Sequence, residues 1–141
     1  MIWDEFVVGA RAVSWLAYLG TASTEGRPHV APVTPGFTEN TIWFATRTGS
    51  RKFRNLVENP RTSFHWPVGG TDGPGELFAE GDARLHTSEA DRRRLWTEAN
   101  LPFDPANFFG SPETPDLAFG ETRVTSASIL GPDFHRSFYR P

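Results

Sequence analysis

The sequence predicts a mainly β fold in which six or seven antiparallel strands close into a barrel. Two observations favour this fold class. Most of the expected strands are joined by short turns, as antiparallel neighbours are. The helix expected between the third and fourth strands, over residues 51–58, is too short for the crossover of a parallel unit. Since the chain has 141 residues, of which 38% are hydrophobic, we expect one domain over residues 1–141.

The first half of the chain is expected to form a helix and three strands. The helix spans residues 2–14, where apolar residues recur at helical spacing. The strands are rich in apolar residues and bounded by turns, at residues 15–24, 29–37 and 41–46. Pro32 and Pro35 interrupt the second strand. Because proline cannot donate to a neighbouring strand, we expect an edge or a bulge here, with backbone groups that face something else.

The second half begins with the helix over residues 51–58, which should bury Phe53, Leu56 and Val57 and end at Asn59-Pro60. The strand over residues 61–66 alternates, with Thr62, Phe64 and Trp66 on one face. A glycine-rich loop is expected over residues 67–75 and a strand over residues 76–86. A helix of about ten residues then opens at Thr87, with Leu95 and Trp96 as its apolar contacts. An irregular excursion over residues 100–120 follows, and two strands, over residues 122–130 and 134–139, end the chain. The run Arg92-Arg93-Arg94 predicts a solvated helix face with local ion pairs.

Composition and charge exclude several classes of function. The formal charge of −3 gives no support to binding of nucleic acid or of a membrane surface. The chain has no cysteine and its four histidines lack ligand spacing, so we expect no metal site. The first residues lack the basic and apolar regions of a signal peptide, so we expect a cytoplasmic location.

Lys52 is the only lysine, and it lies in the first turn of the expected helix. Gly49 suits a tight turn, and Ser50 is a good N-cap. Arg51 and Lys52 then stand where the helix dipole disfavours cations, which indicates a bound anion. A phosphate there could be held by free backbone N–H groups, a hydroxyl and two positive side chains. The alternative is a capped surface helix with solvated cations.

Several runs of residues carry a resemblance to a known family. They are Gly26-Arg27-Pro28-His29-Val30, Trp43-Phe44-Ala45-Thr46, Gly49-Ser50-Arg51-Lys52, Asn55-Leu56 and Glu58-Asn59-Pro60-Arg61. In this order and strand context the chain resembles the pyridoxamine 5′-phosphate oxidase-like family, the FMN-binding split barrels. The resemblance implies a six-stranded split barrel and a homodimer with two cofactors at its interface.

The resemblance also implies a cofactor site. Ser50, Arg51 and Lys52 would bind the terminal phosphate of FMN, or of coenzyme F-420 in some branches. Trp66 and the C-terminal strand would contribute the far wall from the partner chain. The full set of implied cofactor-binding residues is Ala31, Pro32, Val33, Thr34, Ala45, Thr46, Ser50, Arg51, Lys52 and Trp66.

The chain departs from the true pyridoxamine phosphate oxidases in two regions, around the second strand and near the C-terminus. Their phosphate-binding arginine and substrate lysine align with about Ala31 and Gly36, and their C-terminal Trp and Arg-x-His pair are matched only loosely. We therefore favour a flavin-dependent oxidoreductase acting on another small molecule. The alternatives are an F-420-dependent reductase, a non-catalytic flavin- or haem-binding protein related to stress, and a member whose pocket has degenerated. The sequence identifies no catalytic acid.

Overall fold

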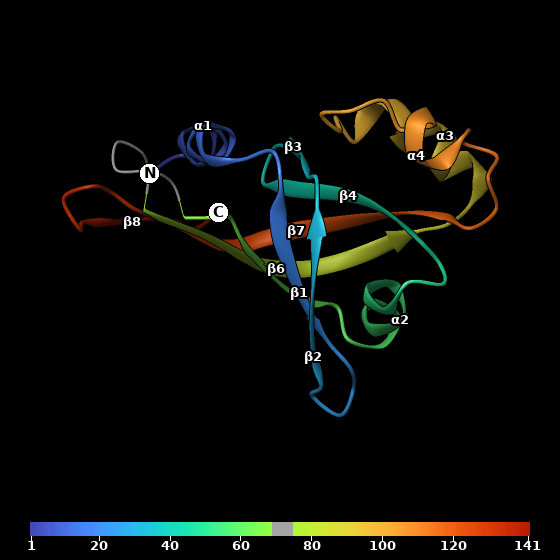
Figure 1. Cartoon of the computed structure of the whole chain (residues 1–141), viewed down its shortest axis with the longest axis horizontal. Coiled ribbons are helices and arrows are strands. Elements are labelled where there is room, and N and C mark those ends of the chain that lie inside the picture. The colour runs from blue at the N-terminus through green and yellow to red at the C-terminus, as the bar shows by residue number, and fades with distance from the viewer. Residues whose placement is uncertain (69–74) are drawn as a thin grey trace.

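Eight strands form one antiparallel sheet that curls into a barrel, with four helices around it (Figure 1). The computed structural model describes residues 1–68 and 75–141. The elements in chain order are α1 (Trp3–Val13), β1 (Ala17–Ala22), β2 (Pro28–Val33), β3 (Gly36–Thr38), β4 (Thr41–Arg47), α2 (Arg51–Glu58), β5 (Arg61–His65), β6 (Glu76–His86), α3 (Glu89–Glu98), α4 (Ala106–Phe109), β7 (Leu117–Leu130) and β8 (Arg136–Tyr139). The predicted mainly β, antiparallel barrel is confirmed.

The strand order explains how the barrel closes. Seven strands follow the path β2-β1-β5-β6-β7-β4-β3, and β8 pairs with β7 beside it. The two end strands, β2 and β3, are consecutive in the chain and are linked only by Thr34 and Pro35. The two ends of the sheet are therefore joined by the chain itself at this corner. No strand pairing links β2 to β3 or β4 in the described residues, and this unpaired gap is here called the seam. β2 pairs only with β1, so the predicted edge strand at Pro32 is confirmed.

Two hydrophobic clusters lie on opposite faces of β4. The larger cluster fills the barrel and includes Ile42 and Phe44, with Phe6 of α1 packed against it. The smaller one joins Trp43 to Leu95 of α3. Because both faces of β4 are covered, its burial is almost continuous rather than alternating. In Figure 1, α1 and the α3–α4 segment lie above the long strands β6 and β7, and α2 lies below them.

Several predicted boundaries differ from the structure. The strand expected over residues 29–37 is divided into β2 and β3, because Pro35 ends the pairing. β7 begins at Leu117 rather than at 122, so the irregular excursion is shorter than predicted and contains α4. The loop expected at residues 67–75 falls mainly on residues 69–74, which lie outside the described residues. None of the described helices is long and apolar enough to span a membrane.

Two helical side chains differ from the prediction. Val57 of α2 is exposed, and Asn55 is buried instead, where its amide donates to Thr21 Oγ1 at 3.1 Å. Arg92 of α3 is also buried, and its guanidinium donates to the carbonyls of Thr87 and Pro112. Both polar groups are buried because backbone or side-chain oxygens satisfy them.

Candidate functional site

The start of α2 provides backbone donors for an anion. Ser50 is the N-cap, and its Oγ accepts from Phe53 N at 3.2 Å, as the sequence predicts. Thr46 Oγ1, at the end of β4, lies 2.9 Å from Ser50 Oγ. The N–H groups of Arg51 and Lys52 lie in the first helical turn, where the carbonyls four positions earlier are outside the helix, so they have no partner within it. Among the described residues neither N–H group has another acceptor, so both can bind an anion.

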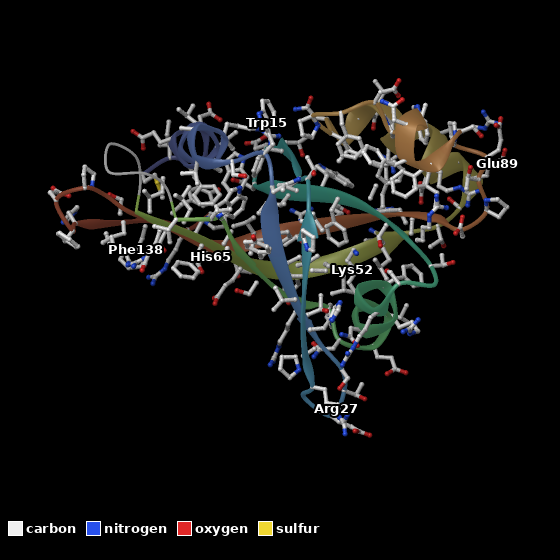
Figure 2. The ribbon with its side chains drawn as sticks, in the orientation of Figure 1. Trp15, Arg27, Lys52, His65, Glu89 and Phe138 are labelled. Carbon is white, nitrogen blue, oxygen red and sulfur yellow. The ribbon has the colours of Figure 1, made fainter. Side chains whose placement is uncertain are left out.

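The positively charged side chain of Lys52 is partly buried. Figure 2 shows its side chain extending from α2 toward the strands. Burial lowers the pKa of the Lys52 ammonium from its ordinary value. In the described part of the chain no carboxylate lies within ion-pair distance of this group, whereas Arg47 and Arg136 each have one and Arg93 and Arg94 each have two. A half-buried cation without a carboxylate favours an anionic ligand.

Lys52 forms one side of an apolar pocket of about 290 Å³ at the seam between β2 and β4. The walls come from the residue before β1, the end of β2 and the residue that follows it, β4, α2 and the segment around α4. The lining residues are Leu16, Pro32, Val33, Thr34, Ala45, Lys52, Phe103, Phe108 and Phe109. A small apolar pocket with one charged group at its side is typical of a site for a flat organic ligand with an anionic end.

The structure brings five of the predicted cofactor residues together in this wall: Pro32, Val33, Thr34, Ala45 and Lys52. Ser50 and Arg51 lie next to Lys52 at the helix start but outside the pocket lining.

Three predicted residues lie away from the pocket lining. Ala31 pairs with Leu19, and the buried Thr46 hydroxyl contacts Ser50. Trp66 is fully buried between Phe6, Phe37 and Phe64 in the barrel core. Because its side chain has no exposed surface, Trp66 is not part of the pocket lining of this chain.

Sequence reasoning missed Leu16 and the three phenylalanines of the pocket. The available signal was the cluster of Phe103, Phe108 and Phe109 in the irregular, proline-rich excursion over residues 100–120. Their place in the wall depends on how α3 and α4 fold back over β4, which no local pattern encodes.

Gly36 explains why the aligned substrate lysine of the true oxidases is absent. A Cβ at this position would lie 2.1 Å from the carbonyl oxygen of Ala99, so no side chain fits. The end of α3 occupies that space, and Asn100 Nδ2 donates to the Phe37 carbonyl at 3.1 Å. The space beside β3 is therefore filled by the end of α3 rather than by a charged side chain on β3.

A second hollow is larger than the pocket at Lys52, but it is not an apolar pocket with a single cation. It has a volume of about 720 Å³ and lies beside α1 and the turn that contains Glu39 and Asn40. Its charged side chains are Asp4, Glu39 and Arg140, so acidic groups outnumber the single basic one. It is a poor match for an anionic ligand.

Comparison with known proteins identifies the family. The profile described as pyridoxamine 5′-phosphate oxidase matches residues 10–127. The chain belongs to the pyridoxamine 5′-phosphate oxidase family. No curated protein matches the chain, but solved structures share the family's split-barrel fold. General stress protein 26 from Bacillus anthracis has 16% identity and a TM-score of 0.73, with 100% of each chain covered.

Two further structures of this fold carry ligand names. A pyridoxamine 5′-phosphate oxidase-related, FMN-binding protein from Nostoc punctiforme has 18% identity and a TM-score of 0.69, covering 98% of this chain and 93% of its own. A heme-binding protein from Mycobacterium smegmatis has 20% identity and a TM-score of 0.75, covering 96% of this chain and 57% of its own. At these identities the likeness to each structure establishes the fold alone.

Proposed function

We propose that the pocket binds FMN and that the protein is an FMN-dependent oxidoreductase acting on a small organic substrate. The observation that carries this proposal is Lys52, a half-buried cation without a carboxylate partner in the described part of the chain, set in the side of an apolar pocket. A phosphate would supply the missing negative charge. The apolar walls suit a planar ring.

The chain's own residues would bind and shield this cofactor. When bound, FMN supplies the hydride or electron chemistry. The N–H groups of Arg51 and Lys52, together with the Arg51 guanidinium and the Lys52 ammonium, would hold the phosphate. The corner at Pro32 to Thr34 would line the ring, and the phenylalanines of the lining would exclude water from it. This division of labour requires no catalytic dyad or triad in the protein.

The pocket favours a flavin over haem. Haem iron in proteins is usually held by an axial side chain such as histidine. The lining residues include no histidine. FMN and coenzyme F-420 both offer a phosphate and a tricyclic ring, so the choice between them rests on experiment.

Absorbance spectroscopy of the purified protein tests the proposal. We expect flavin bands near 375 and 450 nm (roughly, a property of the cofactor) after titration with FMN, and a fall in flavin fluorescence on binding. A band near about 420 nm on titration with F-420 alone would replace FMN by the deazaflavin. A protein that binds neither would refute the proposal. Turnover with reduced cofactor and a panel of electron acceptors would separate an enzyme from a binding protein.

We also propose that the protein is a homodimer, because one row of the sheet's outer face presents aromatic side chains. Tyr18 pairs with His65, and His65 with Phe78. Phe78 pairs with Ser128, and Ser128 with Phe138. The three aromatic residues are 45%, 37% and 54% exposed, respectively. Such a patch is typical of a protein interface.

The row also reaches the pocket, because Pro32 pairs with Tyr18 and lines the pocket wall. A second copy covering the row would therefore lie next to the ligand. Light scattering should give twice 15.7 kDa. Phe138→Glu should shift the mass to the monomer, whereas Phe134→Glu, an exposed position outside the row, should not. A monomeric wild type, or a dimer that survives Phe138→Glu, would contradict this interface.

A further inference from the structure

The segment after α3 presents an aromatic surface to the pocket. Phe103 and Phe108 meet edge to face, with ring centroids 5.2 Å apart, and Phe109 lies beside them in the lining. Phe108 is 64% exposed, although it belongs to the helical turn α4. These three side chains, here called the aromatic wall, carry no hydrogen-bonding group. The wall can therefore recognise shape and apolar area, but it cannot recognise a hydrogen-bond pattern.

Arg47 attaches the aromatic wall to the end of β4. Its guanidinium donates to both carboxylate oxygens of Asp116, at 2.9 and 3.1 Å, and to the carbonyl of Phe108 at 2.8 Å. It also lies 5.1 Å from the centroid of the Phe109 ring. The backbone adds a further tie, because Thr48 N donates to the Asp116 carbonyl at 2.8 Å.

This attachment couples the two ends of the pocket. Arg47 ends β4, and Ser50, the cap of the helix that carries Lys52, follows three positions later. Ser50 N donates to the carbonyl of Arg47 at 2.9 Å. Nη1 of the guanidinium donates to the Asp116 carboxylate while Nη2 donates to the Phe108 carbonyl, so one planar group is held by two separate acceptors. Arg47 is thus the side chain that links the wall to the segment that leads into α2 and Lys52.

We propose that Phe103, Phe108 and Phe109 contact the planar ring of the ligand whose phosphate is bound at Lys52, and that Arg47 is the positioning residue of this wall. The inference rests on the proposed function and deepens it, since it names the residues that recognise the ring. The ligand class is a planar, largely uncharged ring with an anionic tail. The wall contributes equally to ligands that share the ring and differ only in the phosphate.

Riboflavin and FMN separate the wall from the phosphate site. Phe108→Leu keeps an apolar side chain but removes the aromatic face, and we expect it to raise the Kd of both ligands by the same factor, about three- to tenfold. Lys52→Met should raise the Kd of FMN only. The matched control is Phe134→Leu, because Phe134 is 86% exposed and lies outside the pocket lining. Flavin fluorescence titration measures all of these values.

The outcomes distinguish two failures. If the wild type binds neither flavin, the proposed function itself is wrong. If FMN binds and responds to Lys52→Met while Phe108→Leu leaves both Kd values unchanged, the aromatic wall is refuted and the phosphate site stands. A loss confined to FMN after Phe108→Leu would also overturn the wall, because the ring is common to both ligands.

Double variants test the positioning role of Arg47. We expect Arg47→Met to weaken riboflavin binding and to reduce the fluorescence quenching of bound flavin at saturation. Phe108→Leu should then add little in the Arg47→Met background, because the wall is already displaced. Asp116→Asn should reproduce part of the effect. Fully additive losses from Arg47→Met and Phe108→Leu, or unchanged quenching in Arg47→Met, would refute the positioning role.

Discussion

Helices α2 and α3 begin with the same cap and then carry opposite charge. Ser50 Oγ accepts from Phe53 N at 3.2 Å, and Ser88 Oγ accepts from Asp91 N at 3.1 Å. The first turn of α3 contains two acidic residues, as the helix dipole prefers, whereas the first turn of α2 contains none. α2 has Arg51 and Lys52 there instead.

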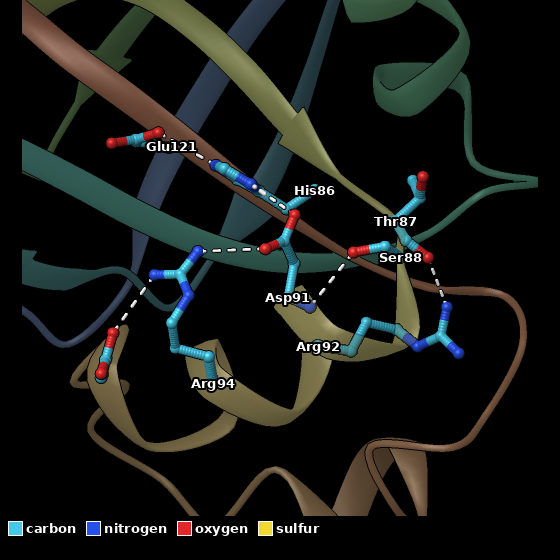
Figure 3. Close-up of polar contacts among 8 residues, drawn as sticks. His86, Thr87, Ser88, Asp91, Arg92, Arg94 and Glu121 are labelled. Carbon is cyan, nitrogen blue, oxygen red and sulfur yellow. Dashed lines mark hydrogen bonds and ion pairs between the residues drawn. The ribbon is translucent and has the colours of Figure 1, made fainter.

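The cations of the two helices also differ in their partners. Arg94 of α3 is bonded to Asp91 and Glu98, and Arg92 donates to the Thr87 carbonyl (Figure 3). His86 lies between Asp91 and Glu121, so the base of α3 is a closed network (Figure 3). Lys52 of α2 has no carboxylate partner in the described residues. A helix start whose charges are satisfied internally is structural, and one whose charges are not is a candidate binding site.

The largest expected effect concerns the ligand at α2. The double variant Arg51→Ala/Lys52→Ala should weaken FMN binding by about 3–6 kcal/mol, since each charge-assisted phosphate contact is worth about 1.5–3 kcal/mol. Fluorescence titration measures the change. Arg93→Ala/Arg94→Ala on α3 is the matched control and should leave the Kd unchanged. An unchanged Kd in the α2 variant would remove the phosphate assignment.

The next effect concerns stability at α3. Arg92 is only 8% exposed and donates to two backbone carbonyls. Arg92→Leu should lower the free energy of unfolding by about 2–3 kcal/mol, because both carbonyls lose their donor. Urea denaturation provides the measurement. A loss below about 0.5 kcal/mol, the usual range for surface substitutions, would place Arg92 among the surface cations.

Replacing a cation of α2 by an apolar residue should leave the free energy of unfolding unchanged, in contrast to Arg92→Leu. Lys52→Met removes a partly desolvated cation that has no carboxylate to lose, so the ligand-free protein should keep its free energy of unfolding within about 0.5 kcal/mol. FMN affinity should fall in the same variant. A marked destabilisation of the ligand-free protein would show that Lys52 has a structural role, as Arg92 does.

The smallest effects are expected from changes of pH. Alkaline pH should affect FMN binding at α2, and acid pH should affect the packing of α3. Burial lowers the pKa of Lys52 below 10.5, so FMN affinity should fall as alkaline pH approaches that lowered value and the ammonium loses its proton. Riboflavin, which has no phosphate, is the control and should show no such loss before its own ring titrates. Fluorescence titration across this range measures both affinities, and an equal alkaline loss for both ligands would contradict the assignment.

At α3, hydrogen bonds from Arg94 and then His86 lower the pKa of Asp91 below 3.8. Its stabilising contribution is therefore complete above the unfolded value and is lost as acid pH falls through the folded one. Near-ultraviolet circular dichroism should show the packing of α3 loosening only in this acid range. Loosening of α3 near neutral pH would contradict the assignment.

Local structure was predictable where the determinants are local. The bounds of α2 follow from Ser50 at one end and Asn59-Pro60 at the other, and the structure reproduces them. β7 was predicted too short because Leu117 to Gly120 follow a proline-rich stretch, and only pairing with β4 reveals their strand character. Arg92 was assigned to the surface because its buried acceptor, the Pro112 carbonyl, is twenty positions away in the chain.

The candidate site divides in the same way. The residues from Ser50 to Lys52 form a contiguous run, so their cap and charge can be read from the sequence. The aromatic wall and Arg47 become part of the site only through contacts across the fold, including Arg47 with Asp116. Trp66 lies in the barrel core, because alternation places it on one face of its strand but does not say whether that face points into the barrel or toward a ligand.

The two-residue corner of Thr34 and Pro35 has a kinetic consequence. The pairs β1–β2 and β3–β4 on either side of it are local hairpins, whereas β1–β5 and β4–β7 join segments far apart in the chain. Local pairs close with less loss of chain entropy and so form more readily during folding. The pocket has one wall on β2 and another on β4, so it exists only after the distant pairs have formed. A ligand that spans the seam would therefore slow unfolding of the barrel more than it accelerates folding.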